Sequence, residues 1–276
     1  CIRDSTGLDA GGLTAKQSNC LILDWETSEN QTWWRNREIL QAREINPGDW
    51  PDPDAPQGGR TGMVYYRFMA GPLINDVEFL KAQIAEKNIG TICIDSAGPA
   101  CGGEPENASS TLSFFEALRS LSDHNKPLQS LILAHVTHAA KKGANSSPFG
   151  SVYWQNIPRN TFELQSAQTT NANYSDYALH HRKSNLGPLR DPIGIRLTWD
   201  RGCTIEGLNI RENAQLAAGL PYAERALMAI EQHGPQSSET LADLMDATMK
   251  VITATLSRDD RFTSVNGKWD SSETNW

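Results

Sequence analysis

Three short apolar segments, each followed by polar side chains, constrain the fold of this chain more than any other feature. They are LILDWE at residues 21–26, TICIDS at 91–96 and SLILAH at 130–135. Short aliphatic runs of this kind predict buried strands. Each predicted strand therefore delivers an acidic or imidazole side chain at its carboxyl end.

Segments with helical periodicity separate these strands. Apolar residues recur at helical spacing over 27–43, 77–88 and 109–122, and a further strand is predicted over 64–68. A chain that alternates strands with helices folds as a mostly parallel sheet covered by helices. We therefore expect an α/β fold, in which ligands lie beyond the carboxyl ends of the strands.

The middle of the chain continues with strands and then changes in composition. Strands are predicted over 161–164, 176–182 and 193–199, and the last two could pair with each other. The composition shifts over 202–216, which we interpret as a linker. The first domain is therefore expected to cover residues 1–201.

A small C-terminal domain is expected over 217–276. Three helices are predicted there, followed by two strands around Asn266-Gly267, a pair that strongly favours a two-residue hairpin. Three helices and a hairpin are the elements of a winged helix-turn-helix. The segment has five basic and nine acidic side chains, so DNA binding and protein docking both stay open. The basic side chains that could contact DNA are Lys250 and Arg258 of the third helix, and Lys268 and Arg261 of the hairpin region.

Composition excludes several classes of protein. The net charge of −8 argues against a passive, charge-driven nucleic-acid coat. No apolar run approaches the ~20 residues of a membrane span, and no secretion signal is visible. The five cysteines form no C-x-x-C pair, which fits reduced thiols. We expect a cytoplasmic protein.

Three of the strand ends carry residues that suit phosphate chemistry. Asp95 follows an apolar strand in the manner of a Walker B aspartate, which holds the water shell of Mg²⁺ near bound phosphates. Glu26 could orient or deprotonate an attacking water. Alternatively, Asp95 only caps the end of its strand, and Glu26 is a solvated charge at the start of the next helix. Asp24 is either a second carboxylate of the site or an inward structural residue. His135 and His138 lack the third ligand that a metal hydrolase requires, so a structural role is the alternative for His135.

Two basic groups follow. Lys141 and Lys142 lie in a Gly-, Ser- and Asn-rich loop, which suits contact with the phosphates of a single strand. Arg159 and the cluster at 180–183 could reach a phosphate held by a neighbouring subunit, as an arginine finger does. Alternatively, Lys141 and Lys142 lie in an ordinary solvated loop, and Arg159 and the cluster at 180–183 form surface ion pairs.

The combination resembles the RecA-like ATPases of the RepA-type hexameric replicative helicases of phages and plasmids. The stretches that carry the resemblance are LILDWE (21–26), VYYRFMAGPL (64–73), TICIDSAGPACGG (91–103), FFEALRSL (114–121), SLILAHVTH (130–138), PFGSVYWQNIPRNTFEL (148–164) and HHRKSNLGPLRDPIGIRLTW (180–199). The resemblance implies a RecA-like ATPase core over residues 1–201.

The resemblance also implies roles for single residues. Glu26 corresponds to the glutamate that activates water, and Asp95, with Ser96 beside it, to the aspartate that serves Mg²⁺ and ATP. His135 corresponds to the sensor of the γ-phosphate. Arg159 corresponds to the finger offered to the adjacent subunit.

Further basic residues correspond to elements that act outside their own subunit. Lys183, with Arg182 beside it, matches a basic hairpin that is also directed at the neighbour. Lys141 and Lys142 fall in the segment that faces the central channel. The resemblance thus implies a homo-oligomeric ring, expected to be a hexamer, that moves along single-stranded DNA and meets a replication initiator or primase. A non-hydrolysing winged-helix DNA-binding regulator is the alternative from another class, and a KaiC-like or recombinase-like ATPase is the alternative within it.

One element of the family is missing. The sequence contains no G-x-x-x-x-G-K-[ST] run, which in the family lies ahead of the strand at 21–26 and grips the phosphates. We therefore expect a chain truncated by at least the phosphate-loop strand and helix, with a natural pseudo-ATPase as the alternative. As given, the chain is predicted to bind ATP poorly or not at all and to be inactive by itself, whereas the full-length parent is predicted to be an ATPase.

Overall fold

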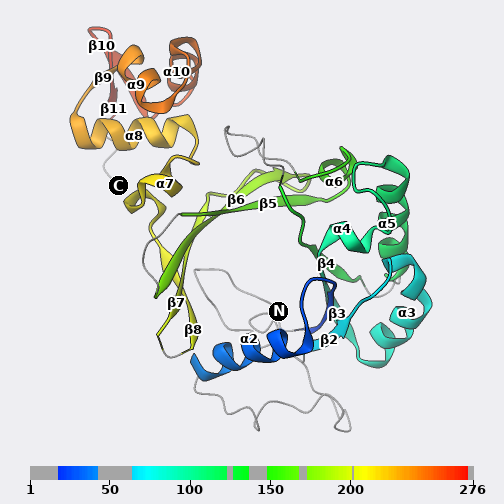
Figure 1. Cartoon of the computed structure of the whole chain (residues 1–276). Helices are drawn as coiled ribbons and strands as arrows, with labels where there is room; N and C mark the ends of the chain where they lie inside the picture. The colour runs from blue at the N-terminus through cyan, green and yellow to red at the C-terminus, as the bar shows by residue number, and fades with distance from the viewer. Residues whose placement is uncertain are drawn as a thin grey trace.

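A computed structural model supplies the structure of the chain. It describes residues 18–42, 64–122, 127–136, 148–167, 173–200 and 202–272. The described residues form a parallel sheet with its helices, an antiparallel sheet, and a C-terminal group of short helices and strands (Figure 1). His138, Lys141 and Lys142 lie outside the described residues.

The four strands of the first sheet are all parallel, as predicted. Their order is β2-β1-β3-β4, so β2 and β4 form its edges. The strands are β1 (Asn19–Asp24), β2 (Val64–Phe68), β3 (Ile89–Asp95) and β4 (Gln129–Ile132). The longer helices are α2 (Glu29–Ala42), α3 (Val77–Glu86) and α5 (Ala108–Ser120), with η2 (Leu73–Asp76) and α4 (Ala97–Ala100) between them. The α/β fold expected from the alternation of strands and helices is confirmed.

The core of this region lies between the sheet and its helices. Leu23 of β1 and Ile92 and Ile94 of β3 are fully buried, which explains why their segments read as continuous apolar runs. The short helix α6 (Tyr153–Asn156) adds Trp154, whose ring lies 5.1 Å from that of Phe114. Burying side chains of this size contributes about 2 kcal/mol each, so this core fixes the strand ends firmly.

The second sheet is antiparallel, with the strand order β5-β6-β7-β8. Its strands are β5 (Asn160–Ser166), β6 (Tyr174–Ser184), β7 (Ile193–Trp199) and β8 (Cys203–Leu208). The predicted pairing of the second and third of these strands is present. Among the described strands, these four form a sheet separate from the parallel one.

The linker expected over 202–216 instead contains regular structure. It holds β8, the short 3₁₀ helix η4 (Ile210–Glu212) and α7 (Ala214–Ala217). Ile210 and Leu216 are buried in a small core with Ala178 of β6. The strand escaped prediction because its stability depends on pairing with β7, which composition does not reveal.

The C-terminal region contains the predicted three helices and hairpin, and one further strand. Its elements are α8 (Tyr222–His233), β9 (Gln236–Ser237), α9 (Ser238–Met245), α10 (Met249–Leu256), β10 (Phe262–Val265) and β11 (Lys268–Ser271). The three strands form an antiparallel sheet in the order β10-β11-β9. Asn266 and Gly267 both have positive φ, as the predicted two-residue hairpin requires. Figure 1 shows this region apart from the parallel sheet and joined to the rest through α7.

Within the described part of the chain, no helix has both the length and the apolar character needed to cross a lipid bilayer.

Candidate functional site

The carboxyl ends of β1, β3 and β4 lie side by side because these strands are parallel neighbours. Asp24 of β1 is in register with Asp95 of β3. Just beyond the strands, the Ser96 hydroxyl donates a 2.6 Å hydrogen bond to Glu26 Oε1. His135 Nε2 lies 3.9 Å from the same oxygen. The expected convergence of three strand ends at one rim is therefore present.

Backbone hydrogen bonds extend the sheet past the strands and hold this rim together. Trp25 N donates to Asp95 O at 2.7 Å, and Ala97 N donates to Leu133 O at 2.8 Å. The indole of Trp25 also donates to Gly71 O at 2.9 Å. The peptide bond between Asp95 and the next residue is cis. The residues that carry the polar groups are thus fixed to one another through their backbones.

Asp24 shapes the turn that presents Glu26. Its side chain is buried and accepts hydrogen bonds from Glu26 N at 2.8 Å, from Thr27 N at 2.9 Å and from the Thr27 hydroxyl. Burial raises the pKa of Asp24, but the hydrogen bonds from Thr27 and Glu26 outweigh burial and lower it overall. Of the two roles left open for Asp24, the contacts match the inward structural one.

Asp95 is the carboxylate with the opposite shift. Burial raises its pKa, and the negative charges of Asp24 and Glu26 raise it further, while Arg35 and His135 oppose them. Three carboxylates close together at a partly buried rim favour a cation. The described residues contain no group of three or more His, Cys, Asp or Glu side chains that could hold a metal ion alone. Asp95 fits a magnesium ion that phosphates and water complete, since Mg²⁺ takes few protein ligands.

The rim is open to solvent. The His135 side chain is 81% exposed and that of Glu26 is 42% exposed. A separate cavity of about 550 Å³ lies over β2 between α2 and α3, and none of the three strand-end groups lines it. The candidate site is therefore the exposed rim, where a large ligand can enter, and not this cavity.

Arg159 lies at the start of the antiparallel sheet, immediately before β5. Its backbone oxygen accepts a 2.9 Å hydrogen bond from Asn185 N, which extends the β5–β6 ladder by one residue. The side chain is exposed and has no hydrogen-bond or ion-pair partner among the described residues. An arginine presented in this way is free to meet a group outside its own chain.

The basic cluster at 180–183 is engaged within the chain. His180 is buried, His181 is stacked on a ring at 4.5 Å, Arg182 forms a 2.6 Å ion pair, and Lys183 donates to three carbonyls. His180 hydrogen-bonds Gln165, His181 stacks on Phe162 and Arg182 pairs with Glu163. The three carbonyls bound by Lys183 belong to Gln155, Asn156 and Pro158. Sequence alone could not reveal these contacts because most of the partners lie 15 to 28 residues away.

The basic residues of the C-terminal region differ in their availability. Lys250, Arg258 and Lys268 are exposed, and none of them has a side-chain partner in the described part of the chain. Arg261 does not belong with them, because its guanidinium binds the carboxylates of Asp259 and Glu224. Three of the four candidate DNA contacts are therefore free.

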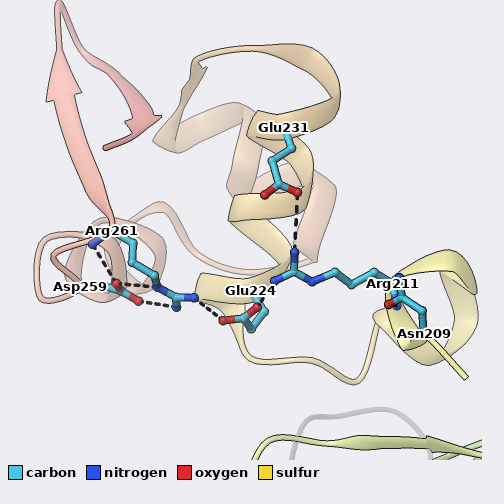
Figure 2. A network of polar contacts seen from close by, with 6 residues as sticks. All are labelled: Asn209, Arg211, Glu224, Glu231, Asp259 and Arg261. Atoms are coloured by element: carbon cyan, nitrogen blue, oxygen red, sulfur yellow. Dashed lines mark hydrogen bonds and ion pairs between the residues drawn. The ribbon is translucent and has the colours of Figure 1, made fainter. Parts of the chain in front are cut away.

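Figure 2 shows the network that engages Arg261. Arg211 of η4 reaches Glu224 at 2.7 Å and Glu231 at 3.7 Å, both on α8. Glu224 also receives Arg261, which approaches from the loop before β10. Burial raises the pKa of Glu224, but the two guanidinium groups outweigh burial and lower it overall. The network fastens η4 to the C-terminal region.

Comparison with known proteins places the chain in a family. None of the curated proteins searched matches it significantly. The sequence profile described as an AAA domain matches residues 2–141, about half of the chain, including β1 to β4 and their polar ends. AAA domains are ATPase modules that use nucleotide and Mg²⁺ and commonly assemble into rings. With a parallel sheet of RecA-like type and this match, the chain belongs to the AAA domain family.

Proposed function

We propose that the chain is the motor part of an ATP-dependent DNA translocase of the replicative-helicase type, similar to the RepA-type enzymes. The observation that carries the proposal is the convergence of Glu26, Ser96 and His135 on one exposed rim of the parallel sheet. Water attack on a phosphoryl group needs positioning and charge stabilisation more than covalent chemistry, and a rigid rim of this kind can supply both.

Glu26 is the proposed general base. Ser96 occupies Oε1 with a 2.6 Å hydrogen bond, which leaves Oε2 to accept the proton of an attacking water. Asp24 fixes the turn that carries Glu26, as its hydrogen bonds to Glu26 N and Thr27 N indicate. Asp95 would hold Mg²⁺ through water. When bound, Mg²⁺ supplies positive charge to the phosphate oxygens.

The proposed site is completed between subunits of a homo-oligomeric ring, which we propose to be a hexamer. His135 would contact the γ-phosphate held in its own subunit, since its side chain is exposed beside Glu26. Arg159 would reach the nucleotide of the adjacent subunit, because it is exposed and has no partner among the described residues. Lys141 and Lys142 are proposed to face single-stranded DNA in the channel.

The C-terminal region is proposed to be a winged-helix domain over 217–276, beside an ATPase core over 1–201. Its order of helix, strand, two helices and hairpin is that of a winged helix. Lys250, Arg258 and Lys268 are the proposed DNA contacts, and an initiator or primase is the alternative partner. Because the sequence has no G-x-x-x-x-G-K-[ST] run, we expect the 276-residue chain to bind ATP weakly.

The test is ATP hydrolysis by the full chain at millimolar Mg²⁺–ATP, with and without single-stranded DNA. Any hydrolysis by this chain is expected to be slow, to be stimulated by DNA and to fall by about 10²-fold or more in Glu26→Gln. The matched control is Glu29→Gln, an exposed glutamate of α2. Hydrolysis that is equal in the two variants would contradict the proposal, whereas absent hydrolysis is already expected from the missing G-x-x-x-x-G-K-[ST] run.

A second function is favoured by the separate C-terminal region with its three free cations. In this alternative the chain is a non-hydrolysing DNA-binding regulator, and the sheets form a scaffold. DNA affinity that ATP does not change, with no Glu26-dependent hydrolysis, would support the regulator in place of the motor.

A further inference from the structure

We propose that Lys183 is a positioning residue that holds the turn carrying Arg159 within its own subunit, and that it does not contact the neighbour's nucleotide. The inference rests on the proposed function of Arg159. The resemblance to RepA-type helicases implies that Lys183 is a second cation directed at the neighbouring subunit. The role proposed here is different.

The contacts of the Lys183 ammonium carry the proposal. Its Nζ donates to the carbonyl oxygens of Gln155 at 2.8 Å, Asn156 at 2.8 Å and Pro158 at 2.7 Å. An ammonium has three N–H donors and no acceptor, so all of its hydrogen bonds are used inside the chain. Charge-assisted bonds of this length belong to the strong class.

The acceptors explain why a lysine is needed. Gln155 and Asn156 are the last residues of α6, and Pro158 follows the helix end. The final carbonyls of a helix lack intrahelical partners and carry partial negative charge, which a cation satisfies. Lys183 therefore closes the end of α6 and fixes the path of the chain into Arg159.

The same contact joins two parts of the molecule. Trp154 of α6 is buried in the core of the parallel sheet and donates from its indole to Pro105 O at 3.0 Å. Lys183 lies on β6 of the antiparallel sheet, opposite Thr161 of β5. It thus ties the antiparallel sheet to a helix that is anchored in the core of the parallel sheet.

The backbone of the turn is held from both sides, while the Arg159 side chain has no hydrogen-bond or ion-pair partner among the described residues. Lys183 binds the carbonyls before Arg159, and Asn185 N binds the carbonyl of Arg159 itself at 2.9 Å. A group that must reach a phosphate in another subunit benefits from a backbone fixed beforehand. For Lys183 to reach the neighbour itself, all three of its hydrogen bonds would have to break.

Amide hydrogen exchange of the full chain tests this geometry without any need for hydrolysis. Lys183→Met should accelerate exchange at Asn156, Ile157 and Asn185, whose amides are hydrogen-bonded, by roughly tenfold or more. Exchange in α8 should not change. The conservative variant Lys183→Arg should restore part of the protection. The matched control Lys81→Met removes an exposed lysine of α3 and should leave these amides unchanged. Unchanged exchange in Lys183→Met would overturn the proposal.

A double-mutant cycle on DNA-stimulated ATP hydrolysis tests the functional part. If Lys183 acts only through Arg159, adding Lys183→Met to Arg159→Ala should cause no further loss of turnover. Losses that multiply would show that Lys183 touches the neighbour's nucleotide, and would overturn the proposal. If hydrolysis does not depend on Glu26 while Lys183→Met still loosens the turn, the proposed motor function fails and the anchoring role of Lys183 stands alone.

Discussion

The rim of the parallel sheet and the ionic network of the C-terminal region both gather acidic side chains, but they balance the charge differently. At the rim, Asp24, Glu26 and Asp95 lie close together, and the one contact described there between a carboxylate and a basic side chain is that of Glu26 with the His135 imidazole, at 3.9 Å. The pKa of Asp95 is raised there, first by burial and then by its acidic neighbours.

In the network, every carboxylate meets an arginine. Arg211 contacts Glu224 and Glu231, and Arg261 contacts Glu224 and Asp259 (Figure 2). Carboxylates that are paired with arginines stabilise the folded structure, whereas clustered carboxylates without such partners are typical of sites that bind a ligand. The difference supports the proposed chemistry at the rim and a structural role for the network, and neutralising Asp95 at the rim should act on stability in the opposite way to removing Arg261 from the network.

The largest effect is expected for Asp95→Asn on turnover. Removing the charge that would face Mg²⁺ should lower ATP hydrolysis by about 100-fold, because even outer partners of metal ligands are worth 10–100-fold. The measurement is the rate of hydrolysis across a magnesium titration, with Asp243→Asn, an exposed aspartate of α9, as the control. An unchanged magnesium requirement would show that the unbalanced charge of the rim serves no cation.

The next effect is expected for Asp24→Asn. Asp24 is buried and accepts three hydrogen bonds, so the amide would lose charge-assisted bonds from Glu26 N and the two donors of Thr27. We expect a loss of about 2 kcal/mol in the free energy of unfolding, measured by urea denaturation. A variant as stable as the wild type would show that the turn is held by the strands alone.

The strand-end site could be predicted because its geometry follows from local pattern. Apolar runs of strand length fix β1, β3 and β4, and the carboxyl ends of parallel neighbours must share an edge. The hairpin at Asn266-Gly267 is local in the same sense. A signal for Asp24 was also present, since an aspartate at a strand end often accepts from the backbone N–H two residues on in an Asx turn, as Asp24 does from Glu26 N.

Side-chain partners from distant parts of the chain could not be predicted. Lys183 is a plain member of a basic run in the sequence, and its role depends on carbonyls 25 to 28 residues earlier. In the sequence, Arg261 and Lys268 are both basic residues of the hairpin region, yet of these two only Arg261 forms ion pairs with carboxylates in the described part of the chain. The strand β8 depends on pairing with β7. Each of these features is set by tertiary contact and not by periodicity.

A smaller effect is expected for Arg261→Met. It leaves Asp259 without the guanidinium that binds it and leaves Glu224 with Arg211, although Arg261 is 40% exposed and solvent screens much of the interaction. We expect a loss of about 1 kcal/mol in stability, by thermal or urea unfolding. The control is Arg258→Met, which removes an exposed arginine without a partner among the described residues and should change stability by less than about 0.5 kcal/mol. Equal effects of the two variants would remove the contrast between matched and free charge.

The smallest effect, and the sharpest test of the comparison, is the pH dependence of two stability differences. The pKa of Asp259 is lowered by hydrogen bonds from Arg261, against burial, so its stabilisation is present above its unfolded value of about 4 and is lost as pH falls through the folded value. The pKa of Asp95 is raised, so ionising it costs stability as pH rises from about 4 through the folded value. At pH 7, Arg261→Met should therefore unfold at a lower temperature than the wild type and Asp95→Asn at a slightly higher one, and both differences should shrink toward pH 3. Differences of the same sign at pH 7 would mean that the rim, like the network, is balanced for stability, and its role as a cation site would lose its physical basis.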